Sequence, residues 1–279
     1  MLTIVASMEQ EIASLRRDLR RRATWAGGMP DVTVIGVGEE RVVEASRRLM
    51  GLSLHPPGRP FPLPEKLLMV GFTGGLDPTL AAGQLVLSSR YYLAAGAMSK
   101  QEPAGILVAG GREDFLSPDP DLWRQAVEAA ADAGVPSVKV DSLTVSRLVT
   151  SPQAKRALGQ LYPAGVVNME DYWVARTARK AGVPFLSARV VLDTADQALP
   201  GYLLGLSGSR TRAVLSIAAL PWRIPAVLSL ARRVPPARRV LAKFALAFLE
   251  RLNRGEAEER RLLTSTSGHL SRSARNVST

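Results

Sequence analysis

The stretch AGVVNMEDYWVARTARKAGVPFLSARVVLDTADQAL, residues 164–199, predicts a strand, a helix, a second strand and an acidic loop. Its first apolar run ends at Val167, and Asn168 can cap a helix that ends near Gly182. The next apolar run, Phe185–Leu192, has only two polar residues, as expected for a strand buried on both faces of a sheet. The stretch therefore predicts an α/β fold.

Acidic residues follow both predicted strands. Glu170 comes directly after the first strand, and Asp193 and Asp196 come after the second. Ligands of an open α/β sheet bind beyond the carboxyl ends of its strands, so we expect these acids to converge on one crevice. An acid in this position is also a common helix cap or turn former, and the pattern alone leaves both interpretations open.

The composition favours a globular protein with one large core or two small ones. Of 279 residues, 46% are hydrophobic and 22% charged. The absence of cysteine excludes disulfides, thiolate catalysis and cysteine-ligated zinc, and fits a cytoplasmic protein. The two histidines, His55 and His269, have loop-like surroundings, so we expect no metal site, and we expect no resident cofactor. Residues 1–7 are too short an apolar run to resemble a secretory signal.

Positive charge is concentrated at the C-terminal end. Residues 201–279 carry 14 Lys/Arg and 4 Asp/Glu, whereas residues 1–200 carry 22 and 21. We therefore predict a near-neutral catalytic domain over residues 1–200, a basic amphipathic helical extension over 201–254, and a polar disordered tail over 255–279.

The first 38 residues contain two candidate ligand-binding turns. Leu2–Ala6 predicts a strand followed by a helix whose first turn holds Glu9 and Glu11, where acids complement the helix dipole. A second strand leads into Gly36-Val37-Gly38, whose backbone amides can hold an anion at a helix start. The third glycine of a dinucleotide-binding fingerprint is replaced by Arg41, which argues against an NAD site.

Four motifs together resemble the superfamily of purine nucleoside phosphorylases and methylthioadenosine/adenosylhomocysteine nucleosidases. The motifs are Ile4-Val5-Ala6-Ser7-Met8-Glu9-Gln10-Glu11, the glycine-rich stretch Gly71–Leu87, Asn168-Met169-Glu170, and Arg189–Asp196. The resemblance implies a three-layer α/β/α fold with a central mixed sheet. It also implies an enzyme that cleaves the bond between a purine and a ribose with phosphate or water.

The resemblance assigns roles to particular residues. Asp193 matches the general acid that protonates or hydrogen-bonds N7 of the purine, and Glu11 matches the acid that orients or activates the attacking water. Glu170 matches the residue that binds the ribose hydroxyls, with Met169 packed against the sugar. Ser146 matches a residue that binds the base. The phosphate or water site is matched by Thr73, Gly74 and Gly36.

Three departures leave open a catalytically degenerate nucleoside-binding protein on the same fold. Phe72 stands where many members have a serine that contacts phosphate, unless Thr73 replaces it. Ser146 stands where an acidic residue is usual, and Asn168 is the third departure.

The segment Ser146–Pro152, followed by Lys155, Arg156 and Leu158, is similar to a hopanoid-associated subgroup of the superfamily. That similarity implies a slight preference for phosphate and suggests adenosylhopane, a lipid-linked nucleoside, as substrate. Methylthioadenosine or adenosylhomocysteine hydrolysis is the alternative. The family also implies a homodimer.

Residues 210–254 alternate arginines with apolar clusters and include Trp222. They contain no uncharged apolar run of 18 residues, which disfavours a membrane-spanning helix. This pattern predicts either peripheral attachment to an anionic membrane, at the inner face, or amphipathic helices packed on the domain. The scarcity of aromatic residues argues against nucleic acid as a partner.

Overall fold

The computed structural model describes residues 2–22, 29–53, 63–94, 115–199 and 224–275. Its strands are β1 (Leu2–Ala6), β2 (Asp31–Val34), β3 (Lys66–Gly75), β4 (Leu85–Leu93), β5 (Phe115–Leu116), β6 (Ser137–Thr144), β7 (Val166–Asn168) and β8 (Phe185–Asp193). Its helices are α1 (Glu9–Arg21), α2 (Glu39–Leu49), α3 (Pro120–Asp132), α4 (Pro152–Leu161), α5 (Asp171–Ala181) and α7 (Ile224–Arg275).

The strands form one mixed sheet in the order β2-β1-β3-β7-β6-β4-β5, with β8 bonded to both β3 and β4. β3 pairs in parallel with β1 and β8 and antiparallel with β7, whereas β4 pairs antiparallel with β8. The hydrogen bonds therefore run from β3 through β7, β6, β4 and β8 back to β3. This closure brings β8 directly beside the glycine-rich end of β3, as the sequence motifs require.

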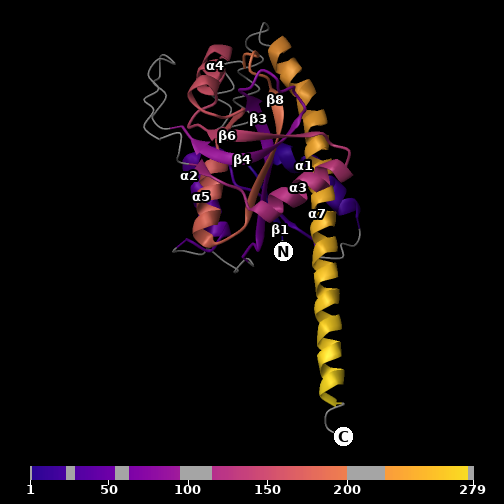
Figure 1. Cartoon of the computed structure of the whole chain (residues 1–279). Coiled ribbons are helices and arrows are strands. Elements are labelled where there is room, and N and C mark those ends of the chain that lie inside the picture. The colour runs from indigo at the N-terminus through magenta and orange to yellow at the C-terminus, as the bar shows by residue number, and fades with distance from the viewer. Residues whose placement is uncertain (1, 23–28, 54–62, 95–114, 200–223, 276–279) are drawn as a thin grey trace.

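Helices cover both faces of the sheet, which confirms the predicted mixed α/β architecture (Figure 1). One core cluster joins α1, α3 and α7 to β1, β3 and β8, and a second joins α2 and α5 to the opposite side. β8 is buried along almost its whole length, because it lies in the interior of the sheet with helices on either side. This burial is the reason for its apolar sequence.

The C-terminal helix α7 packs along the domain and continues well past it (Figure 1). Its buried side chains recur every three or four residues, and all belong to the core that contains β1, β3 and β8: Ala237, Leu241, Phe244, Phe248 and Leu252. Ion pairs reinforce the contact, including Lys66–Glu256 at 2.6 Å and Arg251–Asp132 at 2.9 Å. Of the two interpretations of the basic segment, the described part of α7 follows the one in which it packs on the domain.

Two further sequence expectations fall on the C-terminal region. A disordered tail is predicted from residue 255, whereas α7 extends to Arg275, and the helix-forming residues 256–263 favour the first part of this extension. The described residues do not include four members of the predicted basic extension: Arg210, Arg212, Trp222 and Arg223. Among the helices that the structure describes, none combines the length and hydrophobicity needed to cross a membrane.

Candidate active site

Three of the predicted site residues, all acidic, lie at or just beyond the ends of β1, β7 and β8, beside the C-terminal half of β3. Glu11 lies in the first turn of α1, Glu170 directly precedes α5, and Asp193 is the last residue of β8. All three carboxyls are 2–5% exposed. Glu11 and Glu170 both lie beside Arg189, whereas Asp196, which was expected in the same crevice, is exposed on the turn after β8.

Glu11 is held by backbone amides from two elements. Its Oε2 accepts from the amides of Ser7 at 2.9 Å and Met8 at 2.8 Å, and its Oε1 accepts from the amide of Phe72 at 2.9 Å. Burial raises the pKa of Glu11 to about 7, although Arg189 and the bound amides oppose the shift. A carboxyl with this pKa exchanges a proton readily near neutral pH, as a general base must.

Arg189 is a charged residue in the middle of the buried strand β8. Its Nη2 donates to Asp171 at 2.6 Å and to Glu170 at 3.3 Å, and its Nη1 donates to the carbonyl of Phe72 at 3.2 Å. Gly71 is the register partner of Arg189 on β3. A Cβ at Gly71 would lie 2.7 Å from Nη1 of Arg189 and 2.8 Å from Oε1 of Glu11, so only glycine leaves room for both groups.

Asp171 is fully buried and has hydrogen-bond donors on both oxygens. Oδ1 accepts from Arg189 and from the Ser187 hydroxyl at 2.8 Å, and Oδ2 accepts from the Ser142 hydroxyl at 3.0 Å and from Nδ2 of Asn168 at 2.9 Å. This network fixes the Arg189 guanidinium against the start of α5. Asp171 and Arg189 were not identified as site residues from the sequence, although an arginine inside an apolar strand indicates a buried acidic partner.

Asn168 holds the turn that presents Glu170. Its Oδ1 accepts from the amides of Glu170 and Asp171, each at 2.9 Å. Glu170 has a raised pKa, because burial and the nearby Asp171 outweigh the attraction of Arg189. Asn168 thus has a structural role, because it fixes the backbone that carries Glu170.

Asp193 forms an ion pair with Lys155 of α4, which is 0% exposed. The same ammonium donates to the carbonyls of Thr194 at 2.7 Å and Gln197 at 2.9 Å. The pKa of Asp193 is raised, because burial outweighs the opposing effects of Lys155 and Arg233. Lys155 was not singled out for a role in the sequence, although it lies between two apolar positions of the same helix face.

The residues that were predicted to bind phosphate, the base or the sugar have surroundings that differ from one another. Thr73 is buried and its hydroxyl donates to the carbonyl of Val167 at 2.8 Å, so its single hydrogen is already used. A Cβ at Gly74 would lie 3.2 Å from Oδ2 of Asp193, and Gly36 adopts φ +88° before α2. Ser146 is exposed and lies outside the buried group of acids. Met169 is half-buried and packs against an apolar cluster beside α4.

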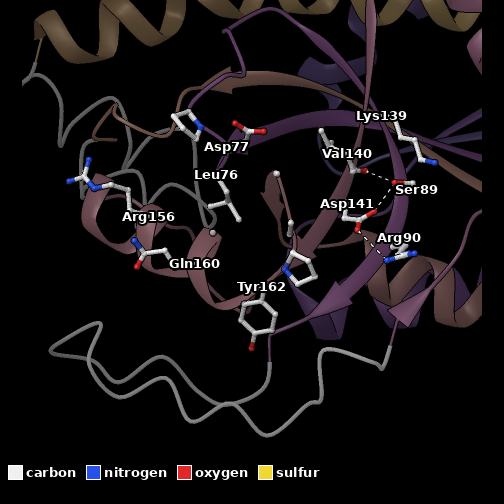
Figure 2. Close-up of a pocket in the computed structure, with 15 residues that line it drawn as sticks. Leu76, Asp77, Ser89, Arg90, Lys139, Val140, Asp141, Arg156, Gln160 and Tyr162 are labelled. Carbon is white, nitrogen blue, oxygen red and sulfur yellow. Dashed lines mark hydrogen bonds and ion pairs between the residues drawn. The ribbon is translucent and has the colours of Figure 1, made fainter.

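A separate pocket of about 880 Å³ lies between α4, the segment that leads into β7, and strands β4 and β6 (Figure 2). Its polar lining includes Asp141, which accepts from the Ser89 hydroxyl at 2.6 Å and lies 3.9 Å from Arg90. None of the predicted site residues lines it. Within the part of the chain that the structure describes, no cluster of acidic or histidine side chains is arranged to hold a metal ion.

Residues 22–215 match the family model of the phosphorylase superfamily. The chain belongs to this superfamily. Membership makes it an enzyme of the nucleoside phosphorylase or nucleosidase type, which cleaves the N-glycosidic bond of a nucleoside. The matched region contains Glu170 and Asp193, and Glu11 lies just before it.

Solved structures with the same fold include two nucleosidases and a futalosine hydrolase. The 5′-methylthioadenosine/S-adenosylhomocysteine nucleosidase of Neisseria meningitidis, in complex with methylthio-immucillin-A, is 18% identical with a TM-score of 0.64, covering 89% of this chain and 98% of that chain. The corresponding Helicobacter pylori nucleosidase is 17% identical, with a TM-score of 0.63 and coverages of 89% and 97%. Helicobacter pylori futalosine hydrolase is also 17% identical, with a TM-score of 0.62 and the same coverages. At this identity the likeness shows the shared fold.

Proposed function

We propose that this enzyme hydrolyses the N-glycosidic bond of an adenine-type nucleoside, with water as the nucleophile. The observation that carries the proposal is the environment of Glu11. This buried carboxyl has a pKa of about 7 and lies beside the Arg189–Glu170 pair. The hydroxyl of Ser7 is also buried and lies beside Glu170, where it lowers the pKa of that carboxyl.

Each acid has a distinct part in the proposed reaction. Asp193 gives a proton to N7 of the purine, so that the base leaves as a neutral molecule. Glu170 binds the ribose hydroxyls and offsets the positive charge that develops on the sugar as the bond breaks. Glu11 takes a proton from the water whose oxygen bonds to the anomeric carbon. The products are free adenine and the free sugar.

The charge of the site favours water over phosphate. Three carboxyls, Glu11, Glu170 and Asp171, surround the single guanidinium of Arg189, so a phosphate dianion would enter a site with little positive charge to spare. The hydroxyl of Thr73 donates to a backbone carbonyl and has no hydrogen left for phosphate. These contacts outweigh the slight preference for phosphate that the sequence similarity implies.

The substrate is tested by adenine release. Purified enzyme is incubated with adenosine, methylthioadenosine and adenosylhomocysteine, with and without phosphate, and free adenine is separated by chromatography. We expect release that does not depend on phosphate. Failure to release base from any of these nucleosides, with binding retained, would instead support the degenerate binding protein.

A lipid-linked nucleoside such as adenosylhopane is the finer proposal for the substrate. Three exposed cations of α7, Arg232, Arg239 and Lys243, are spaced seven and four residues apart and therefore share one face of the helix. Opposite this face lie the side chains that pack on the domain. Such a stripe supports reversible attachment of a cytoplasmic enzyme, proposed as a homodimer, to the anionic inner face of a membrane.

The membrane proposal is tested without removing α7, because that helix contributes to the core. The triple variant Arg232→Glu, Arg239→Glu, Lys243→Glu is compared with wild type in co-sedimentation with anionic liposomes at low and high salt. The matched control reverses two arginines and one lysine exposed on α5: Arg176, Arg179 and Lys180. We expect only the α7 variant to lose salt-sensitive binding. Wild-type protein that stays in the supernatant at low salt would contradict membrane attachment.

A further inference from the structure

Lys155 is buried in a position that an unpaired lysine could not occupy. It lies on the face of α4 that also buries Ala154 and Leu158, and its side chain is 0% exposed. Removing an ammonium group from water is strongly unfavourable unless acceptors replace the water. The acceptors around Lys155 therefore explain why the sequence has a lysine here.

All of these acceptors belong to the turn that ends β8. The ammonium donates to Oδ2 of the Asp193 carboxyl and to the carbonyls of Thr194 and Gln197. An ammonium has three N–H groups, so each one has an acceptor and its orientation is fixed. Arg233 of α7 holds the same turn from another side, donating to the carbonyl of Leu192 at 3.4 Å and to the side chain of Gln197.

We propose that Lys155 is a positioning residue for departure of the purine. Its ammonium fixes the Asp193 carboxyl at the end of β8, and it compensates the negative charge that Asp193 acquires on giving up its proton. This inference rests on the proposed function, and it assigns to Lys155 a role that acts through Asp193 without contact with the substrate.

The movement of the proton and the electron pair explains how Lys155 would assist the reaction. As the bond between N9 and the anomeric carbon breaks, its electron pair goes to the purine and the Asp193 proton goes to N7. Asp193 is left as a carboxylate beside the Lys155 ammonium. Because an adjacent cation stabilises the carboxylate more than the neutral acid, Lys155 makes Asp193 a stronger acid than burial alone would allow.

The charged groups near this pair come from three elements. Lys155 of α4 and Arg233 of α7 lower the pKa of Asp193, whereas burial raises it. Asp196, exposed on the same turn, also feels the charges of Lys155 and of the exposed Arg156. Removal of the Lys155 charge leaves burial opposed by Arg233 alone, so the pKa of Asp193 should rise further.

The test removes the charge of Lys155 while keeping a side chain that is one atom shorter. Lys155→Met and Lys155→Gln are compared with wild type in rate measurements across pH, and Gln can still donate to the backbone carbonyls. Arg156→Met, at the next position on the same helix but exposed, is the matched control. We expect the lysine variants to lose about 10- to 100-fold in kcat. Their alkaline limb should move to higher pH by about one unit or more, because Asp193 must be protonated to act.

A second measurement separates this inference from the proposed reaction. The carboxyl pKa of Asp193 is measured by ¹³C NMR in the wild type and the Lys155 variants, with Asp193→Asn supplying the assignment. A higher carboxyl pKa in the variants supports the role of Lys155 even if no nucleoside is cleaved, an outcome that would overturn only the proposed function. Unchanged pKa values, or an active Lys155 variant with the wild-type pH profile, would overturn the inference.

Discussion

Arg189 is the residue on which the proposed site depends. A guanidinium with a fully buried carboxylate partner keeps its charge, and here it also binds Glu170 and the carbonyl beside Gly71. The pKa of Arg189 is raised by Asp171, Glu170 and Glu11 despite its burial. Its fixed charge lowers the pKa of Glu11 and Glu170 toward values at which these acids can ionise.

Glu11→Gln tests the general base. A glutamine cannot accept the water proton, so we expect kcat to fall by about 10²- to 10⁴-fold. In the wild type, activity should rise with pH through about 7, where Glu11 ionises, and this acidic limb should be absent from any residual activity of the variant. A variant with wild-type kcat would remove Glu11 from the mechanism.

The same pKa predicts a pH-dependent stability. Because folding raises the pKa of Glu11 from 4.5 to about 7, the folded protein binds the proton more tightly than the unfolded chain. The stabilising effect of protonated Glu11 is therefore fully present below pH about 4.5 and is lost as pH rises through about 7. Urea unfolding across this range should show less decline for Glu11→Gln than for wild type, and parallel curves would contradict the shift.

At the scale of elements, short-range patterns predicted the strands better than the contacts among them. The apolar run Phe185–Leu192 forms β8. Asn168 holds the start of α5, the helix that follows it in sequence. The partners of Arg189 and Lys155 were not foreseen, because they lie on other elements, between 18 and 117 residues away in sequence. Arg189 reaches Phe72 across 117 residues, and Lys155 reaches Asp193 across 38. Hydrophobic periodicity indicates which side chains are buried, but it does not indicate which partner each buried charge contacts.

Helix α7 supplies an element-scale prediction. Phe248 is fully buried and stacks on Phe244 at 5.9 Å between ring centroids, so Phe248→Ala should lower the free energy of unfolding by about 3–5 kcal/mol. Lys243→Ala, on the exposed face, should change it by less than about 0.5 kcal/mol. Guanidinium unfolding gives both values. Equal small effects would show that α7 does not belong to the core.

At the scale of the whole molecule, the excess positive charge is only partly free to act on a partner. Arg251 pairs with Glu128 and Asp132 of α3, and Arg233 holds the turn after β8. The sequence predicted the charge asymmetry and the general fold from composition and motifs. It could not separate cations that secure α7 from cations that face solvent, because that depends on which side of a helix meets the domain.

Product analysis in ¹⁸O-labelled water distinguishes water from phosphate as the nucleophile. The enzyme is given the nucleoside that it cleaves, in phosphate buffer, and the sugar product is analysed by mass spectrometry immediately, with an unlabelled free-sugar control for exchange. We expect free sugar that carries one ¹⁸O from the first turnover, with unlabelled adenine. Formation of ribose 1-phosphate or its 5′-substituted analogue as the main product would contradict this expectation.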